Sequence, residues 1–138
     1  MARSRPGALR AAQARFPANV PERRIPGLSP RAREAIRLLE ARTGDYNAIY
    51  LALDAYRQAL RKPGRINSAE HPCPCCDSFE ARDVLGRALE TLPGYARAEL
   101  GRLVAPLDAI LLRRTVPYPW PERRPWATGW WHLRWPER

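Results

Sequence analysis

Long apolar runs are missing from this sequence of 138 residues. No stretch approaches the roughly 20 consecutive apolar residues that a membrane-spanning helix needs, so the sequence predicts no membrane span. The first residues, Met1 to Val20, alternate arginine, alanine and proline and contain no hydrophobic stretch of the kind found in a signal peptide. We therefore expect a cytoplasmic protein.

Lysine is almost absent as well, because Lys62 is the only lysine beside twenty-three arginines. The formal net charge is nevertheless +10, and fifteen prolines outnumber eight glycines. Guanidinium groups pair with phosphate or carboxylate through two parallel hydrogen bonds, which an ammonium group does less well. The composition therefore favours an anionic partner, either RNA or DNA or a nucleoprotein complex.

The basic charge is concentrated at the two ends of the chain. Residues 1–29 hold six arginines and one glutamate, and residues 115–138 hold four arginines and two glutamates. The segment 30–114 is nearly balanced, with fourteen basic and eleven acidic residues. We predict one helical body at 30–114, flanked by a basic extended arm at 1–29 rich in proline and arginine. The tail at 115–138, rich in proline and tryptophan, is expected to pack on this body.

Apolar residues at helical spacing predict an all-α fold, a small bundle of about four short helices. Ser29 and Pro30 predict the start of the first helix, which ends at Gly44. Asp45 is expected to cap the second helix, which ends before Pro63. A plain α-hairpin is favoured over a DNA-binding helix-turn-helix for this pair, since base-reading donors are scarce at the start of the second helix.

The second half of the body predicts two further helices in an antiparallel hairpin. Asp77 and Glu80 resemble a capping box at the start of the third helix, which ends at Pro93. The fourth helix follows at once and contains Pro106, whose ring should kink or split it near Ala105. In the tail, alternating apolar residues over 131–135 predict a short extended stretch.

All three cysteines lie in the sequence His71-Pro72-Cys73-Pro74-Cys75-Cys76, just ahead of the third helix. Cys73 and Cys76 have the spacing that lets two thiolates bind one tetrahedral zinc ion, and the pattern resembles half of a zinc knuckle with His71 as third ligand. The same thiols also fit a redox pair of the glutaredoxin type, or buried structural cysteines. The candidates for a fourth zinc ligand are Cys75, Asp77 and His132.

All five tryptophans lie in the last nineteen residues, interleaved with prolines and arginines. Their rings can pack on the helical body, stack on nucleic-acid bases, enter the groove of a protein partner or rest at a membrane surface. We favour packing on the body, because its core is small. The tryptophans concerned are Trp120, Trp126, Trp130, Trp131 and Trp135.

Few residues in this chain indicate catalysis, since no serine has an evident histidine partner and no glycine-rich phosphate loop is present. We expect a small non-enzymatic accessory protein that binds nucleic acid or a nucleoprotein assembly through its basic arms, with zinc supporting the helical body. The alternatives are an adaptor that uses the tail for protein interactions, and a thiol redox protein. The arginines expected to contact nucleic acid are Arg3, Arg5, Arg10, Arg15, Arg23, Arg24, Arg123 and Arg124.

Overall fold

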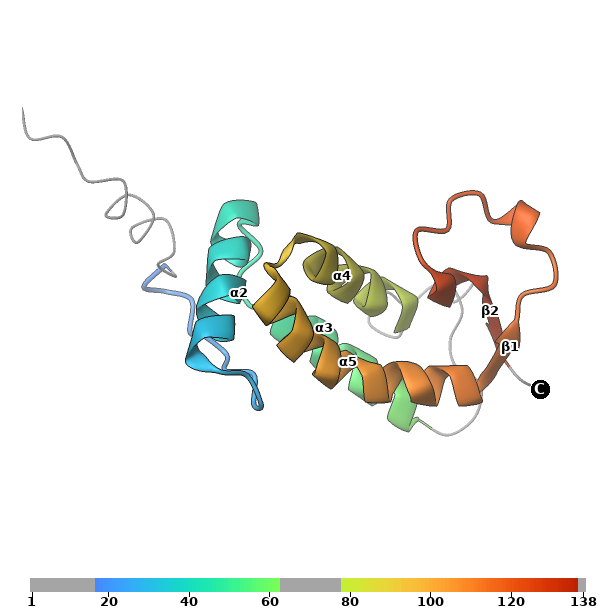
Figure 1. Cartoon of the computed structure of the whole chain (residues 1–138), viewed down its shortest axis with the longest axis horizontal. Coiled ribbons are helices and arrows are strands. Elements are labelled where there is room, and N and C mark those ends of the chain that lie inside the picture. Colours follow the sequence, from blue (N-terminus) through green and yellow to red (C-terminus); the bar gives the residue numbers. More distant parts are fainter. Residues whose placement is uncertain (1–16, 63–77, 137–138) are drawn as a thin grey trace, which may run out of the picture.

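The computed structural model of the protein describes residues 17–62 and 78–136. In these ranges it contains the helices α2 (Pro30–Thr43), α3 (Ala48–Arg61), α4 (Ser78–Thr91) and α5 (Gly94–Arg113). The tail forms the strands β1 (Thr115–Pro117) and β2 (Arg134–Pro136), with the 3₁₀ helices η2 (Pro121–Arg123) and η3 (Trp130–Leu133) between them. The predicted small helical bundle is therefore confirmed (Figure 1). No helix in the described ranges is long and apolar enough to cross a membrane.

The first helix has the predicted bounds, and the residue at its start also contacts another helix. The Ser29 hydroxyl accepts a hydrogen bond from the Ala32 N–H at 3.2 Å, and Gly44 ends the helix in the left-handed conformation. The N–H and hydroxyl of Ser29 both donate to the Glu99 carboxylate of α5 at 2.8 Å. These two hydrogen bonds lower the pKa of Glu99 and tie the start of α2 to α5.

The second helix begins later than predicted, and Asp45 does not cap it. Asn47 is the N-cap residue, with a positive φ of 63°, and its own side chain makes no capping hydrogen bond. The Glu40 carboxylate of α2 takes this role, accepting from the N–H groups of Asn47 at 2.7 Å and Ile49 at 3.4 Å. A side chain from the preceding helix therefore satisfies the free N–H groups at the start of α3.

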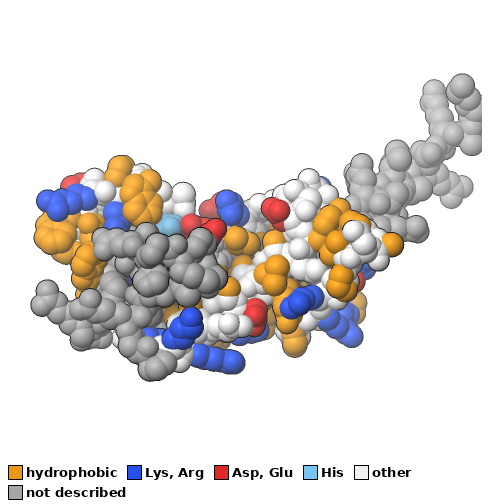
Figure 2. All heavy atoms as spheres, turned by 180° about the vertical axis from the view of Figure 1, so that it is seen from behind, with side chains coloured by type: hydrophobic (Ala, Val, Ile, Leu, Met, Phe, Trp, Pro, Cys, Tyr) orange, Lys and Arg blue, Asp and Glu red, His pale blue; other side chains and the backbone are white. Residues whose placement is uncertain are grey.

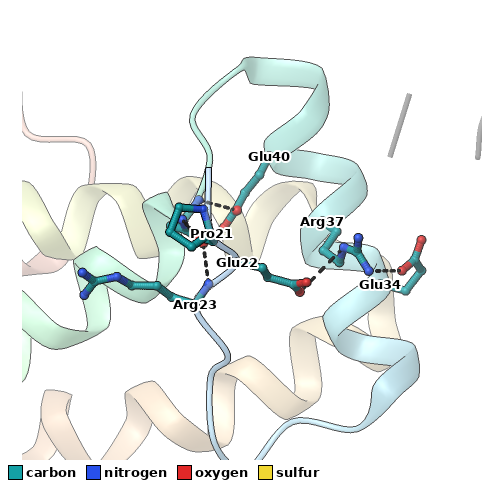
Figure 3. Close-up of polar contacts among 7 residues, drawn as sticks. Pro21, Glu22, Arg23, Glu34, Arg37 and Glu40 are labelled. Atoms are coloured by element: carbon teal, nitrogen blue, oxygen red, sulfur yellow. Dashed lines mark hydrogen bonds and ion pairs between the residues drawn. The ribbon is translucent and has the colours of Figure 1, made fainter. Parts of the chain in front are cut away.

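The Asn47 side chain is instead bound to the segment that precedes α2. Its amide donates to the Pro21 carbonyl, and its oxygen accepts from the Arg23 N–H, both at 2.9 Å. Figure 3 shows this segment beside α2, where Glu22 pairs with Arg37 at 3.6 Å. Ile25 is buried in the core. This part of the predicted N-terminal arm thus packs on the helical body.

Helices α3, α4 and α5 lie alongside one another, with α2 across one end and the β1–β2 pair at the other (Figure 1). Most of the packing is between α3 and α4, whereas α2 packs on α5 rather than along α3. The expected plain hairpin of the first two helices is therefore wrong. The largest fully buried side chains are Tyr56, Phe79, Leu53, Leu85, Leu92, Leu100, Leu111 and Val104.

The last helix contains Pro106 yet runs unbroken for 20 residues, so the predicted split near Ala105 does not occur. Val104 and Leu107, on either side of this position, are both buried in the core. Their packing holds the two halves of α5 in one helix although the proline removes one backbone hydrogen bond.

A polar cluster in the core joins three of the helices. Arg82 of α4 donates to both carboxylate oxygens of Asp108 on α5, at 2.9 and 3.1 Å. The Tyr56 hydroxyl of α3 donates to the same carboxylate at 2.8 Å. Burial, together with the Asp108 charge, raises the pKa of the Tyr56 phenol. The raised pKa keeps the Tyr56 hydroxyl protonated at neutral pH, so that it can donate to Asp108.

The buried Glu40 generates a prediction on pH dependence. Burial raises the pKa of Glu40, although the N–H groups of Asn47 and Ile49 act in the opposite direction. The folded protein therefore binds this proton more tightly than the unfolded chain, and its stability falls as pH rises from about 4.5 through the raised pKa. Glu40→Gln keeps an acceptor oxygen and removes the charge. Its melting temperature relative to wild type should therefore increase with pH across this window.

The matched control is Glu34→Gln, which alters a half-exposed glutamate on the same helix. Thermal unfolding followed by circular dichroism between pH 4 and 8 compares the three proteins. The Glu34 variant should follow the wild-type profile. A Glu40→Gln profile parallel to wild type would show that Glu40 does not control this pH dependence.

Candidate functional site

The tail folds into a loop whose two ends are joined as an antiparallel pair of strands. Thr115 lies opposite Pro136, and Pro117 lies opposite Arg134. Beyond the pair, the Tyr118 N–H donates to the Leu133 carbonyl at 2.8 Å. The predicted extended stretch over 131–135 is confirmed only at its end, because residues 130–133 form the 3₁₀ helix η3.

One carboxylate of α4 anchors the tail to the helices. Asp83 Oδ1 accepts hydrogen bonds from Trp131 Nε1 at 2.7 Å and from Thr128 Oγ1 at 3.3 Å. The same oxygen lies 2.6 Å from His132 Nε2, and in the tautomer with its proton on Nε2 the imidazole donates to this carboxylate. Trp131 and His132 are both buried. Their indole and imidazole rings therefore take fixed positions against α4.

The indole of Trp131 reaches α4 because residue 86 is glycine. A Cβ atom at Gly86 would lie 2.8 Å from the end of the Trp131 ring, closer than atoms of this kind approach. The guanidinium of Arg82 lies over the Trp131 ring, 4.0 Å from its centre. Trp131 is thus held by close packing, a cation–π contact and a hydrogen bond together.

Arg124 is one of the arginines predicted to contact nucleic acid, but it lies inside the tail. Only 8% of the residue is exposed, and its Nη1 donates to the His132 carbonyl at 2.6 Å. Its guanidinium lies 3.8 Å from the centre of the Tyr118 ring and 5.9 Å from that of Trp135. We therefore assign Arg124 to the structure of the tail rather than to its surface.

Three tryptophans remain largely accessible on the outside of the tail. Trp120, Trp126 and Trp130 are 45%, 52% and 37% exposed. The guanidinium of Arg123 lies 5.0 Å from the Trp120 ring centre. In Figure 2, hydrophobic and arginine side chains gather over the end of the molecule that carries the tail. We call Trp120, Trp126 and Trp130 the tryptophan face.

The structure does not bring all the predicted basic residues together. Arg23 and Arg24 are exposed on the segment before α2, and the guanidinium of Arg23 lies 5.3 Å from the Tyr50 ring centre. That segment and the tail, which carries Arg123, lie at opposite ends of the helices (Figure 1). The predicted residues outside the described ranges are Arg3, Arg5, Arg10, Arg15, His71, Cys73, Cys75, Cys76 and Asp77.

Of the candidate zinc ligands, His132 is the one whose surroundings are described. Its Nε2 is bound to Asp83, whereas its Nδ1 is buried and has no hydrogen-bond partner among the residues that the structure describes. No group of three or more histidine, cysteine or acidic residues that could hold a metal ion occurs within residues 17–62 and 78–136. His132 thus offers one oriented ring nitrogen to a ligand.

Sequence reasoning missed the two charged residues of α4 that organise the site. Arg82 precedes Leu85 by three residues and Leu89 by seven, so it lies on the apolar face of the predicted helix. A charged residue on an apolar helix face indicates a buried partner, and this position could have identified Arg82 from the sequence. Asp83 gave no such signal, because its partners come from residues more than forty positions away.

Comparison with protein-family models, curated proteins and solved structures finds no match to this chain. The function is therefore inferred from the chemistry of the residues described above.

The unequal burial of the tryptophans generates a prediction on stability. Trp131→Ala removes a side chain that is 8% exposed and should cost about 3 to 5 kcal/mol, which lowers the melting temperature by roughly 10 to 20 °C. Trp126→Ala removes one that is 52% exposed and should cost below about 1 kcal/mol. Scanning calorimetry of both variants tests this difference. Equal losses would mean that η3 does not anchor the tail.

Proposed function

We propose that this protein is a non-enzymatic accessory protein that binds nucleic acid or a nucleoprotein assembly. The observation that supports the proposal is that several of its exposed arginines are not paired with a carboxylate in the described residues. Within the described residues, no ion pair with a carboxylate is found for five exposed arginines, four on the body and one on the segment before α2. These are Arg24, Arg42, Arg61, Arg87 and Arg113.

An arginine without a carboxylate partner keeps its hydrogen-bond donors available for phosphate oxygens. With a net charge of +10, the protein also attracts polyanions over a distance, and each phosphate that it neutralises releases a counterion. Contacts of this kind position a protein on nucleic acid without selecting a base sequence. We therefore propose binding that is strongly salt-dependent and largely independent of sequence.

We further propose that Cys73, Cys76 and His71 bind one zinc ion and that His132 is the fourth ligand. Within the described part of the chain the buried Nδ1 of His132 has no partner, and Asp83 holds the opposite nitrogen, an arrangement typical of zinc-binding histidines. The His132 and Phe79 ring centres are 6.0 Å apart. Cys76 precedes Phe79 by three residues, a chain length that spans at most about 11 Å. Zinc would supply a structural crosslink between this loop and the tail.

The arginines at the start of the chain give the first functional prediction. Replacing Arg3, Arg5, Arg10 and Arg15 by glutamine in the full-length protein removes four positive charges that we expect to contact phosphates. The slope of log K against log salt concentration should flatten by about three to four units. Fluorescence anisotropy with labelled nucleic acid over a salt series measures this slope.

The matched control replaces the same four arginines by lysine, which keeps the charge and should keep the slope. Binding that is absent at low salt, or that does not respond to ionic strength, would contradict the proposed function.

Zinc binding gives the second functional prediction. Protein purified without a metal-binding tag should contain about one zinc per chain. Cys73→Ser and His132→Gln should each lower the zinc content and the intensity of the visible bands after cobalt substitution. Elemental analysis and absorption spectroscopy measure these effects. Cys75→Ser is the control and should keep the metal. Metal-free protein with three freely alkylated thiols would contradict this proposal.

A further inference from the structure

The proposed phosphate contacts are made by arginines and give the tryptophan face no role. Trp120, Trp126 and Trp130 each expose more than a third of their surface, while Trp131 beside them is buried. Resting on the proposed function, we propose that this face binds the unpaired bases of single-stranded nucleic acid. The protein therefore distinguishes a single strand from a duplex.

The tryptophan face is preformed. Trp120 contacts Tyr118 edge-on at 6.0 Å between ring centres, and Tyr118 lies 5.4 Å from Trp135. Trp126 contacts the anchored His132 ring at 5.2 Å. Trp130 packs edge-on against Trp131, also with its ring centre at 6.0 Å. Each exposed indole is thus supported by a ring behind it, so little conformational entropy is lost when a ligand binds.

The charge of the tail selects an anionic ligand for these rings. Residues 115–136 contain three arginines and one glutamate, and Arg123 is the exposed arginine among them, since Arg124 is buried inside the tail. Arg123 lies next to Trp120, so a phosphate and the base attached to it can be bound together. A neutral proline-rich peptide would also find aromatic rings here, but it has no phosphate to form a charge-assisted hydrogen bond with the Arg123 guanidinium.

The geometry of bases decides between a single strand and a duplex. In a duplex, the faces of the bases are stacked on one another, and only their edges reach the grooves. In a single strand the faces are free, and any base can stack on an indole. Indoles on the outside of a tail, rather than in a narrow cleft, are therefore suited to an unpaired strand of any sequence.

The experiment compares three labelled probes with the full-length protein. They are an oligothymidine of about 15 nucleotides, an abasic strand of the same length, and a hairpin duplex with the same number of phosphates. The abasic strand keeps the phosphates and lacks the bases. We expect the oligothymidine to bind more tightly than both other probes and to quench tryptophan fluorescence.

Variants then assign the difference to the tryptophan face. Trp126→Ala should weaken oligothymidine binding by about 5- to 150-fold, the equivalent of one stacked base, and leave abasic binding unchanged. Trp126→Phe should recover most of the loss, because a phenyl ring also stacks. Leu51→Ala is the matched control, since Leu51 is 51% exposed on α3 and Trp126 is 52% exposed. Circular dichroism confirms that each variant is folded.

The outcomes separate this inference from the function on which it rests. Salt-dependent binding with equal affinity for all three probes would overturn the selection of single strands and leave nucleic-acid binding intact. Absence of binding to every probe would overturn both. Binding of a proline-rich peptide that Trp126→Ala abolishes, without preference for the oligothymidine, would assign the face to a protein partner instead.

Discussion

The ion pair between Arg82 and Asp108 is the contact on which the arrangement of the helices and the tail depends. Arg82 is only 6% exposed, and a guanidinium in such a position is stable only when its charge is paired. Asp108 provides the pair, Tyr56 shares the carboxylate, and the indole of Trp131 covers the guanidinium. The Arg82–Asp108 pair therefore joins three helices, and the Trp131 contact connects it to the tail that Asp83 anchors. Loss of either partner would leave an uncompensated charge in the core, which is far more costly than loss of the pair as a whole.

Local signals predicted the helices well and their contacts poorly. Ser29, Pro30 and Gly44 act within one turn of the chain, so they placed the bounds of α2 correctly. The cap of α3 depends on Glu40, which lies in another helix and bonds to Asn47 across a turn. A nearby aspartate was therefore the natural but incorrect choice for that cap. The effect of Pro106 on the helix was overestimated for a related reason. Core packing on both sides of this residue keeps α5 continuous.

The sequence identified the tryptophans and arginines of the tail as candidate site residues, but it did not show which of them are buried and which are exposed. The five tryptophans were expected to pack on the body, yet Trp131 is buried while Trp120, Trp126 and Trp130 are exposed, and contacts with α4 decide which ring is buried. Trp131 is buried because Asp83 and Gly86 receive it, and neither residue is near it in the sequence. Arg124 illustrates the same limit, since an arginine in a basic segment is indistinguishable from a surface residue until its aromatic neighbours are placed.

The close approach of Gly86 and Trp131 has a consequence for sequence divergence. A side chain at position 86 and an indole at position 131 compete for the same volume. Substitutions at these two positions should therefore be correlated in any homologue that keeps this fold, with glycine accompanying tryptophan and a larger residue accompanying a smaller ring. Such a covarying pair, more than forty residues apart, would identify descendants of this tail after its arginine and proline content has drifted beyond recognition.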